Sequence, residues 1–310
     1  MSIRADGDSI NSAESCEGFE VLKPRVVKLT TRTEVDVRRT LPHKQLRMIG
    51  AWCFVDHYGP TTQVTGMTIG AHPHMGLQTV TWLFDGRIMH NDSLGTHQEI
   101  NPAQLNLMTA GRGIAHSEQS LEAEATMHGV QLWIALPDKS RNIAPLFEHF
   151  SQLPTSSKDG VTTKVFVGQY QDLNSPAKIF SDLVGVEIKS DSEKVNLDLN
   201  PGFEYGVLNV GPEFEVNGHK VGFGDLVYIP LGQTNSQVSS QETIHLLLLG
   251  GRPFGEKILM WWNFIGRTHE EIVAARELWN SHDQSIPDFD DQIKQRIPAP
   301  DLPNLRLNPR

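Results

Sequence analysis

Two pairs of potential metal ligands stand out in the first half of the chain. His72 and His74 are separated by one residue, and His116 and Glu118 repeat this spacing 42 residues after His74. On a β-strand, residues i and i+2 project from the same face, so each pair would present both side chains together. Two such strands side by side would offer three imidazole nitrogens and one carboxylate oxygen to a single ion. That set suits iron, manganese, zinc, nickel or copper, and it contains no thiolate.

Either pair alone would be weak, because a single His-Pro-His or His-Ser-Glu occurs by chance on many surfaces. Together they carry more weight, because both lie in β-like segments near glycines, namely Gly70, Gly76, Gly111 and Gly113. The interval between the pairs leaves room for two or three strands, after which the chain can return beside the first strand. We therefore predict one metal ion on these four ligands, and a six-coordinate ion would keep two positions open.

The elements that would hold these residues are short and β-like. Between residues 50 and 135, apolar runs such as MTIGAHPH, TVTWLF and GVQLWIAL alternate with Gly, Pro, Asn and Asp, which is typical of a β-sandwich or barrel. In a second β-rich region, Asn217 and Gly218 predict a type I′ hairpin, whose turn positions both need a positive φ. Near the C-terminus, Thr268 and Glu271 form the capping box that predicts the start of a helix.

The second β-rich region resembles a copy of the first. Residues 101–111 (NPAQLNLMTAG) and 222–232 (GFGDLVYIPLG) share a turn, a short apolar strand and a turn with glycine, at an offset of 121. Two tandem β-domains would explain this similarity. We expect four parts of the chain: a flexible leader over 1–22, a metal-binding domain over 23–150, a second domain over 151–265, and a helix with a Pro-rich tail over 266–310.

The same offset predicts that the second domain holds no metal. It aligns His116 with Gln237 and Glu118 with Ser239, neither of which repeats the ligand type. The second domain keeps two histidines without a His or carboxylate at i+2, which we expect to be surface or core residues: His219 and His245. In the first domain, a turn-rich loop, HNDSLGTH, has a histidine at each end. We favour a solvated loop over a rim of the metal cavity for this pair, His90 and His97.

Composition excludes several classes of function. The formal net charge of −10 disfavours direct nucleic-acid binding, because such a chain gains nothing from counterion release. The two cysteines, Cys16 and Cys53, stand in no CxxC context and rule out a disulfide framework. The first residues lack the apolar core of a signal peptide, and the longest aliphatic run, residues 244–249, is too short to span a membrane. We expect a cytoplasmic monomer.

Four segments together resemble the pirin family of the cupin superfamily: GAWCFVDHYGP (50–60), AHPHMGLQTVTW (71–82), HNDSLG (90–95) and MTAGRGIAHSE (108–118). The resemblance covers most of residues 30–265. It implies an all-β fold of two tandem cupin domains, each a jelly-roll β-barrel, with a short C-terminal helix. It also implies one metal in the N-terminal domain, usually iron(II), with Mn, Zn, Ni and Cu as alternatives. The family's ligands fall on His72, His74, His116 and Glu118.

The chain departs from the family pattern beside the first ligand pair. Met75 stands in place of Arg, Leu77 in place of Phe, and Gln78 in place of Glu, while Ala103 replaces the Gly that usually follows Pro in a later motif. None of these positions is a ligand. Loss of the charges at Met75 and Gln78 is expected to alter the entrance to the metal, and with it substrate preference and redox tuning.

The resemblance implies two main functions. Some pirin-like proteins cleave flavonols such as quercetin with molecular oxygen, and here the metal would lower the pKa of a flavonol hydroxyl while Glu118 takes the proton. The partner of such an iron-dependent dioxygenase is a small aromatic substrate. The alternative is a non-enzymatic, iron-containing regulatory protein that binds protein partners, as a transcriptional co-regulator or a modulator of a metabolic enzyme. A third possibility is a zinc or nickel cupin without redox chemistry, such as an isomerase.

Overall fold

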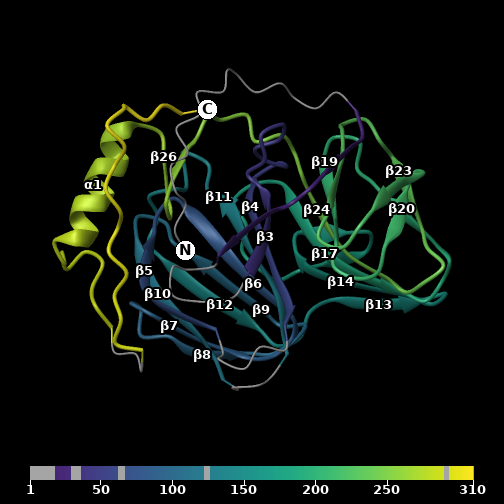
Figure 1. Ribbon diagram of the computed structural model, residues 1–310, viewed down its shortest axis with the longest axis horizontal. Coiled ribbons are helices and arrows are strands. Elements are labelled where there is room, and N and C mark those ends of the chain that lie inside the picture. The colour runs from purple at the N-terminus through teal and green to yellow at the C-terminus, as the bar shows by residue number, and fades with distance from the viewer. Residues whose placement is uncertain (1–17, 29–35, 62–66, 122–125, 290–292, 310) are drawn as a thin grey trace.

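The computed structural model describes residues 18–28, 36–61, 67–121, 126–289 and 293–309. Within these ranges the regular secondary structure is β-strand apart from one helix near the C-terminus (Figure 1). Each half of the chain forms a seven-stranded sheet and a four-stranded sheet. The predicted all-β architecture of two tandem jelly-roll units with a short helix is confirmed.

In the first half, all neighbouring strands are antiparallel. The large sheet has the order β12 (Leu146–Phe150), β9 (Leu105–Thr109), β6 (Leu77–Asp85), β11 (Met127–Ala135), β4 (Trp52–Thr61), β3 (Asp36–Leu41) and β2 (Arg25–Lys28). The small sheet has the order β5 (Thr68–His74), β10 (Ile114–Ser120), β7 (Ile88–Asp92) and β8 (His97–Ile100).

The second half repeats this order. Its large sheet runs β1 (Glu20–Leu22), β22 (Leu226–Ile229), β19 (Glu204–Asn209), β24 (Ile244–Gly251), β17 (Leu183–Ser190), β14 (Val161–Val167) and β13 (Thr155–Lys158). Its small sheet runs β18 (Lys194–Asp198), β23 (Asn235–Ser239), β20 (Phe214–Val216) and β21 (His219–Val221). Short two-stranded ribbons complete the fold: β15 (Gln169–Tyr170) with β16 (Leu173–Asn174), and β25 (Leu259–Trp261) with β26 (Phe264–Gly266). The matching strand orders support the internal duplication.

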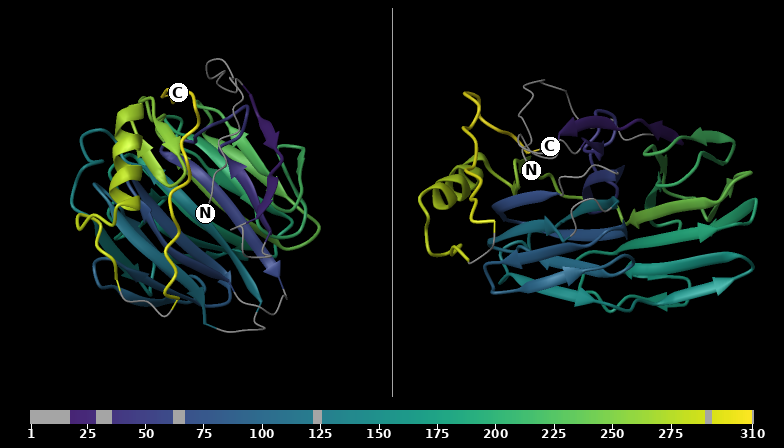
Figure 2. Two further views of the ribbon diagram at one scale, coloured as in Figure 1. Left: turned by 60° about the vertical axis from the view of Figure 1, so that its left-hand side comes forward. Right: turned by 60° about the horizontal axis from the view of Figure 1, so that its bottom comes forward.

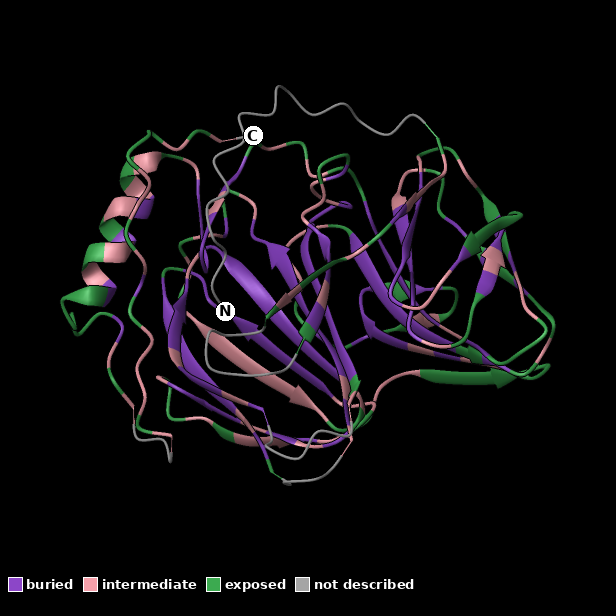
Figure 3. Cartoon of the chain, viewed as in Figure 1, coloured by how far each residue is buried: buried purple, intermediate pink, exposed green. Residues whose placement is uncertain are grey.

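The two large sheets share one apolar core between the halves. This core includes Leu105 and Leu107 of the first half and Leu226 and Tyr228 of the second, and the strands that meet there are buried (Figure 3). These four residues are the ones that the offset of 121 aligns. Because one face of each sheet packs on the other half, the opposite face is left to line the interior of its own jelly roll.

The N-terminal residues of the described chain belong to the second half. Glu20–Leu22 form β1, which pairs with β22, so the end of the predicted leader is an edge strand. Residues 1–17 lie outside the described part, and so does Cys16. The predicted domain limits stay a prediction, although β12 and β13 do place the change of sheet between residues 150 and 155. No helix in the described ranges is long and apolar enough to cross a membrane.

The C-terminal segment packs along the first half (Figure 2). Helix α1 (His269–Asn280) begins at Thr268, whose hydroxyl accepts a hydrogen bond from the Glu271 amide, as the capping box predicts. The tail beyond the helix runs beside the free edge of β5. There the Ala71 amide donates to the Gln295 carbonyl at 2.6 Å, and the Ile297 amide donates to the Ala71 carbonyl at 2.8 Å. The strand that carries His72 and His74 is therefore held on both edges.

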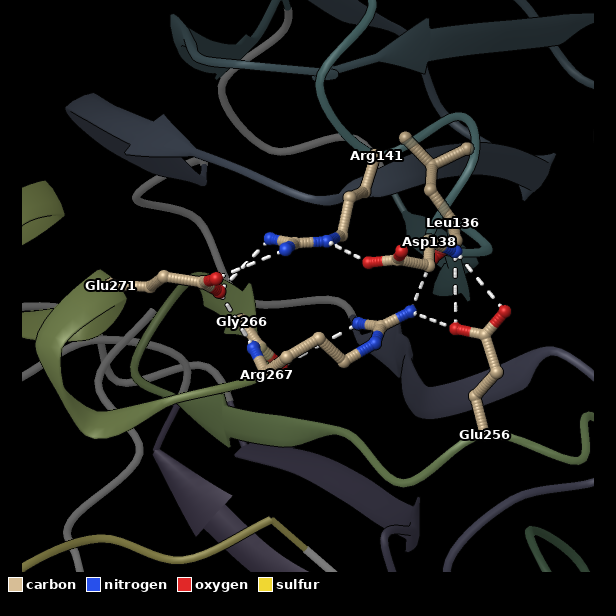
Figure 4. A network of polar contacts seen from close by, with 7 residues as sticks. All are labelled: Leu136, Asp138, Arg141, Glu256, Gly266, Arg267 and Glu271. Atoms are coloured by element: carbon tan, nitrogen blue, oxygen red, sulfur yellow. Dashed lines mark hydrogen bonds and ion pairs between the residues drawn. The ribbon is translucent and has the colours of Figure 1, made fainter.

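A polar network fastens the start of α1 to the first half (Figure 4). The guanidinium of Arg141 makes two hydrogen bonds to the carboxylate of Glu271, both 2.9 Å long. Arg267 donates to the Leu136 carbonyl at 2.9 Å and to Glu256 at 2.5 Å. Paired, planar contacts of this kind fix orientation as well as distance. The helix is thus anchored by directional bonds in addition to its buried face.

Candidate metal centre

Strands β5 and β10 bring the predicted ligand pairs together. The strands are antiparallel neighbours, with His116 opposite His72 and Ile114 opposite His74. All four predicted ligands are at least nine-tenths buried. A β-bulge between His116 and Glu118 shifts the register by one residue. The i, i+2 spacing read from the sequence therefore does place both pairs on one inner face.

Three imidazoles form a compact cluster at this place. Nε2 of His74 lies 3.1 Å from Nε2 of His116, and the ring centroids of His72 and His116 are 4.4 Å apart. A nitrogen from each of the three rings lies within 4.8 Å of the others. The Nδ1–H of His72 donates to the Gly70 carbonyl at 2.8 Å, which leaves its Nε2 free as a ligand. The donor set fits a first-row transition metal.

Glu118 lies beside this cluster but not within it. Its carboxylate oxygen falls within 4.8 Å of nitrogens on His90 and His116, whereas it does not join the group of three imidazoles. The Thr81 hydroxyl lies 3.2 Å from Oε1 of Glu118 and 3.1 Å from the amide oxygen of Gln131. Coordination of one ion by all four predicted ligands would therefore require Glu118 and the imidazoles of His72 and His74 to come closer together.

His90 lies next to the site, so the expectation of a solvated loop is wrong for this residue. It belongs to β7, which pairs with β10, and its side chain is only 3% exposed. Its Nδ1 lies 3.3 Å from Nδ1 of His116, and its Nε2 lies 3.1 Å from Oδ2 of Asp92. His97, at the other end of the loop, is exposed and contacts Asn91. The sequence feature that could have indicated a buried role for His90 is its spacing from Asp92, because residues i and i+2 of a strand lie on the same face.

The candidate ligand cluster lines a small cavity of about 10 Å³, which has room for one ion or water. Its lining adds apolar side chains and two polar ones to the four predicted ligands: Tyr58, Met67, Ile69, Gln131 and Trp133. Among the described residues, neither the Tyr58 hydroxyl nor the Trp133 indole N–H has a hydrogen-bond partner. Both are buried donors beside the candidate metal position, and the sequence alone did not single them out.

Burial controls the protonation of these groups. Desolvation, reinforced by the neighbouring imidazoles, holds the pKa values of His72, His74 and His116 well below the ordinary histidine value. The rings are therefore neutral at pH 7 and keep a lone pair for a cation. Desolvation raises the pKa of Glu118, and the nearby His90 and the Thr81 hydrogen bond oppose that rise. A carboxylate with a raised pKa is a better proton acceptor.

The expected role of Met75 and Gln78 at the metal entrance is wrong. Gln78 is fully buried on the opposite face of β6, where its amide donates to the Thr109 hydroxyl and to the Lys178 carbonyl of the second half. Met75 packs against the apolar cluster under α1. Neither residue lines the cavity. Neighbours in sequence alternate between faces of a strand, so these substitutions act on packing around the site.

The second half has apolar residues at the positions that correspond to the three candidate histidine ligands, and a serine at the position of Glu118. The predicted equivalent of His116, Gln237, is exposed, while the next residue, Val238, is buried opposite Val195. The turn before β23 (230–234) has five residues and that before β10 (110–113) has four, so the offset grows from 121 to 122. Within the described residues, clusters of His, Cys, Asp or Glu that could hold an ion occur in the first half alone. As expected for a surface residue, His219 is exposed, while His245 is partly buried beside Glu187.

Comparison with known proteins gives consistent matches. Residues 34–134 match the Pirin family, and residues 184–284 match the Pirin C-terminal cupin domain. A Pseudomonas aeruginosa protein, provisionally named a quercetin 2,3-dioxygenase, is 40% identical over 309 residues, which cover 98% of both chains. A pirin-like protein of Caulobacter vibrioides is 32% identical, over 82% of this chain and 91% of its own. A crystal structure of quercetin 2,3-dioxygenase from Acinetobacter baumannii has a TM-score of 0.89 at 42% identity, covering 94% of this chain and 98% of that one.

Proposed function

The chain belongs to the pirin family of cupins, and on this premise we propose that it is an iron-dependent dioxygenase that cleaves flavonols such as quercetin. The observation that carries the proposal is the buried cluster of three neutral imidazoles with a carboxylate beside it. The relatives named as quercetin 2,3-dioxygenases, at 40% and 42% identity, support the same reaction. We assign His72, His74, His116 and Glu118 as the metal ligands and Glu118 as the catalytic base.

The residues fit one divalent ion, for which iron(II) is our first choice. When bound, such an ion supplies a Lewis acid that lowers the pKa of a flavonol hydroxyl and exchangeable positions for small ligands. The chain supplies the proton acceptor, because burial raises the pKa of Glu118 and Thr81 orients one of its oxygens. Tyr58 and Trp133 offer free donors to oxygen atoms of a substrate. The side chains of Met67 and Ile69 add an apolar wall to the cavity.

One observation favours a second candidate, a non-enzymatic regulatory protein that binds protein partners. The cavity of about 10 Å³ accepts an ion but is far too small for a three-ring flavonol. Catalysis would require the lining side chains to move apart when the substrate binds. A regulatory protein would need no such opening, because its iron would act through the surface of the protein.

Oxygen uptake by protein that is purified without oxygen and loaded with iron(II) separates the two candidates. We expect oxygen consumption with quercetin and related flavonols in the wild type. Glu118→Gln keeps an oxygen ligand but loses the base, so metal should be partly retained while turnover falls roughly 100-fold or more. His245→Gln, at a partly buried His–Glu pair in the second half, is a control that should retain full turnover. Absence of oxygen uptake with every flavonol would put the regulatory protein first.

A further inference from the structure

A chain of polar contacts leads from the candidate metal ligand His116 to a buried carboxylate. Nδ1 of His116 lies 3.3 Å from Nδ1 of His90, and Nε2 of His90 lies 3.1 Å from Oδ2 of Asp92. His116 faces the cluster through its other nitrogen, which lies 3.1 Å from Nε2 of His74. His90 and Asp92 are 3% and 1% exposed, so water does not compete for these contacts.

The carboxylate end of this chain is rigidly placed. Oδ1 of Asp92 accepts hydrogen bonds from the backbone amides of Leu94 and Thr96, at 2.8 and 3.0 Å. The ring of His90 stacks on Phe147, with centroids 4.5 Å apart and planes 24° from parallel. Strand pairing sets Asp92 directly opposite His116. Each member of the chain is therefore fixed by contacts of its own.

With both rings neutral, the donor and acceptor properties of these groups allow one consistent arrangement of protons. An ionised carboxylate only accepts, so Nε2 of His90 must carry a hydrogen and its Nδ1 must hold a lone pair. Nδ1 of His116 then carries the hydrogen that points at His90. Nε2 of His116 is left as a lone pair that points at the cluster, which is the form a metal requires.

We propose that His90 and Asp92 are a positioning pair that fixes the tautomer and orientation of His116 for metal binding. This inference rests on the metal centre of the proposed function but not on the reaction catalysed there. A competing assignment makes His90 itself a ligand, because His90, His116 and Glu118 also form a group within 4.8 Å. Against that assignment, the cavity is lined by the other three histidines with Glu118 and not by His90.

Asp92→Asn tests the pair with little change of shape. The asparagine oxygen can still accept from the Leu94 and Thr96 amides, whereas its NH₂ group would point a donor at Nε2 of His90. His90 would then carry its hydrogen on Nδ1, and His116 would be driven to the tautomer that protonates the metal-facing nitrogen. We expect cobalt(II) to bind Asp92→Asn 10- to 100-fold more weakly than wild type in competition with a chelator, with one ion still bound at saturation.

His90→Gln and His90→Leu provide the matched pair of variants. Glutamine can accept from His116 and donate to Asp92, so it should retain most of the cobalt affinity, while leucine should lose as much as Asp92→Asn. The unfolding temperature of each metal-free variant shows whether it is folded, and His245→Gln is the control for loss of a partly buried His–carboxylate contact elsewhere. Equal cobalt affinity in wild type and Asp92→Asn would overturn the proposal. Complete loss of the bound ion in His90→Gln would instead identify His90 as a ligand.

These outcomes are independent of the proposed reaction. Suppose that cobalt(II) binding depends on Asp92 as expected but the wild type shows no oxygen uptake with flavonols. That result would overturn the proposed dioxygenase activity and support the positioning pair. A wild type that binds no divalent metal would overturn both.

Discussion

Nε2 of His74 lies 3.1 Å from Nε2 of His116, across two neighbouring strands, and both residues are only 1% exposed. Two neutral imidazoles at this distance can share one hydrogen at most, and Nε2 of the third ring, His72, has no hydrogen bond to any residue that the structure describes. A cation between the rings satisfies all three lone pairs. The cluster should therefore be more stable with metal than without it.

Metal removal provides the first test. An ion that binds only the folded chain adds about 4 kcal/mol of stability at a thousandfold excess over its dissociation constant. We expect chelation to lower the unfolding temperature of the wild type, and His74→Ala to lose most bound metal and this dependence on chelator. Metal content by elemental analysis and thermal unfolding with and without chelator check this. Retention of one tightly bound ion by His74→Ala would remove His74 from the ligand set.

Tyr58→Phe is expected to raise the stability of the metal-free protein while it weakens the binding of a ligand at the metal. The buried Tyr58 hydroxyl has no partner among the described residues, so its removal should raise the stability of the metal-free protein by about 1 kcal/mol. If the hydroxyl donates to a bound ligand, flavonol turnover or azide affinity of the metal-loaded protein should fall about tenfold. Tyr205→Phe is the matched control, because the Tyr205 hydroxyl accepts from the Asn200 amide at 2.8 Å and its loss should destabilise. A destabilised Tyr58→Phe would contradict the argument.

Ala103→Gly should stabilise the fold. Ala103 has φ of 61°, in the left-handed region where a Cβ costs about 1–2 kcal/mol, and family members usually have Gly there. The greater freedom of unfolded glycine offsets part of the gain, so we expect a net increase of roughly 0.5–1 kcal/mol in the free energy of unfolding. Urea unfolding measures it. Ala110→Gly, at a buried position without a positive φ, should instead destabilise the protein.

Acid should weaken the protein through a histidine pair outside the metal centre. Nε2 of His57 lies 2.8 Å from Nε2 of His128. Burial, with nearby His245 and Arg38, lowers the pKa of His128 to about 4, and burial also holds the pKa of His57 well below its usual value. Because the folded state favours the neutral rings, their contribution is fully present above about pH 6.5 and is lost as pH falls toward 4.

Denaturant unfolding between pH 7 and 4 measures this loss, which should reach on the order of 2 kcal/mol for His128 after allowance for its partial exposure. His128→Gln keeps a hydrogen-bonding side chain but does not titrate, so its stability should depend less on pH in this range. An unchanged slope in the variant would rule out the pair as the source.

Much of the site follows from local rules that the sequence expresses directly. A strand repeats every two residues, so His72 and His74 had to share a face, and so did His116 and Glu118. The Asn217-Gly218 hairpin and the Thr268 cap depend on the same kind of local chemistry, and both are present, with φ of 48° and 82° at the two turn residues. Sequence also separated the two halves, because the offset of 121 matches the residues at the shared core.

Tertiary structure decided which residues reach the site from a distance and which neighbours turn away from it. His90 lies beside the site because β7 pairs with β10. His90 and His116 are 26 residues apart in sequence, so no local pattern predicts their contact. Gln78 does not line the cavity, because its face of β6 packs on the second half. The turn before β23 has one residue more than the turn before β10, and a shift of one residue moves every side chain of a strand to the other face. Val238, rather than the predicted Gln237, therefore lies on the inner face. Strand pairing and strand register are properties of the folded chain as a whole, and they determine the surroundings of the candidate ligands.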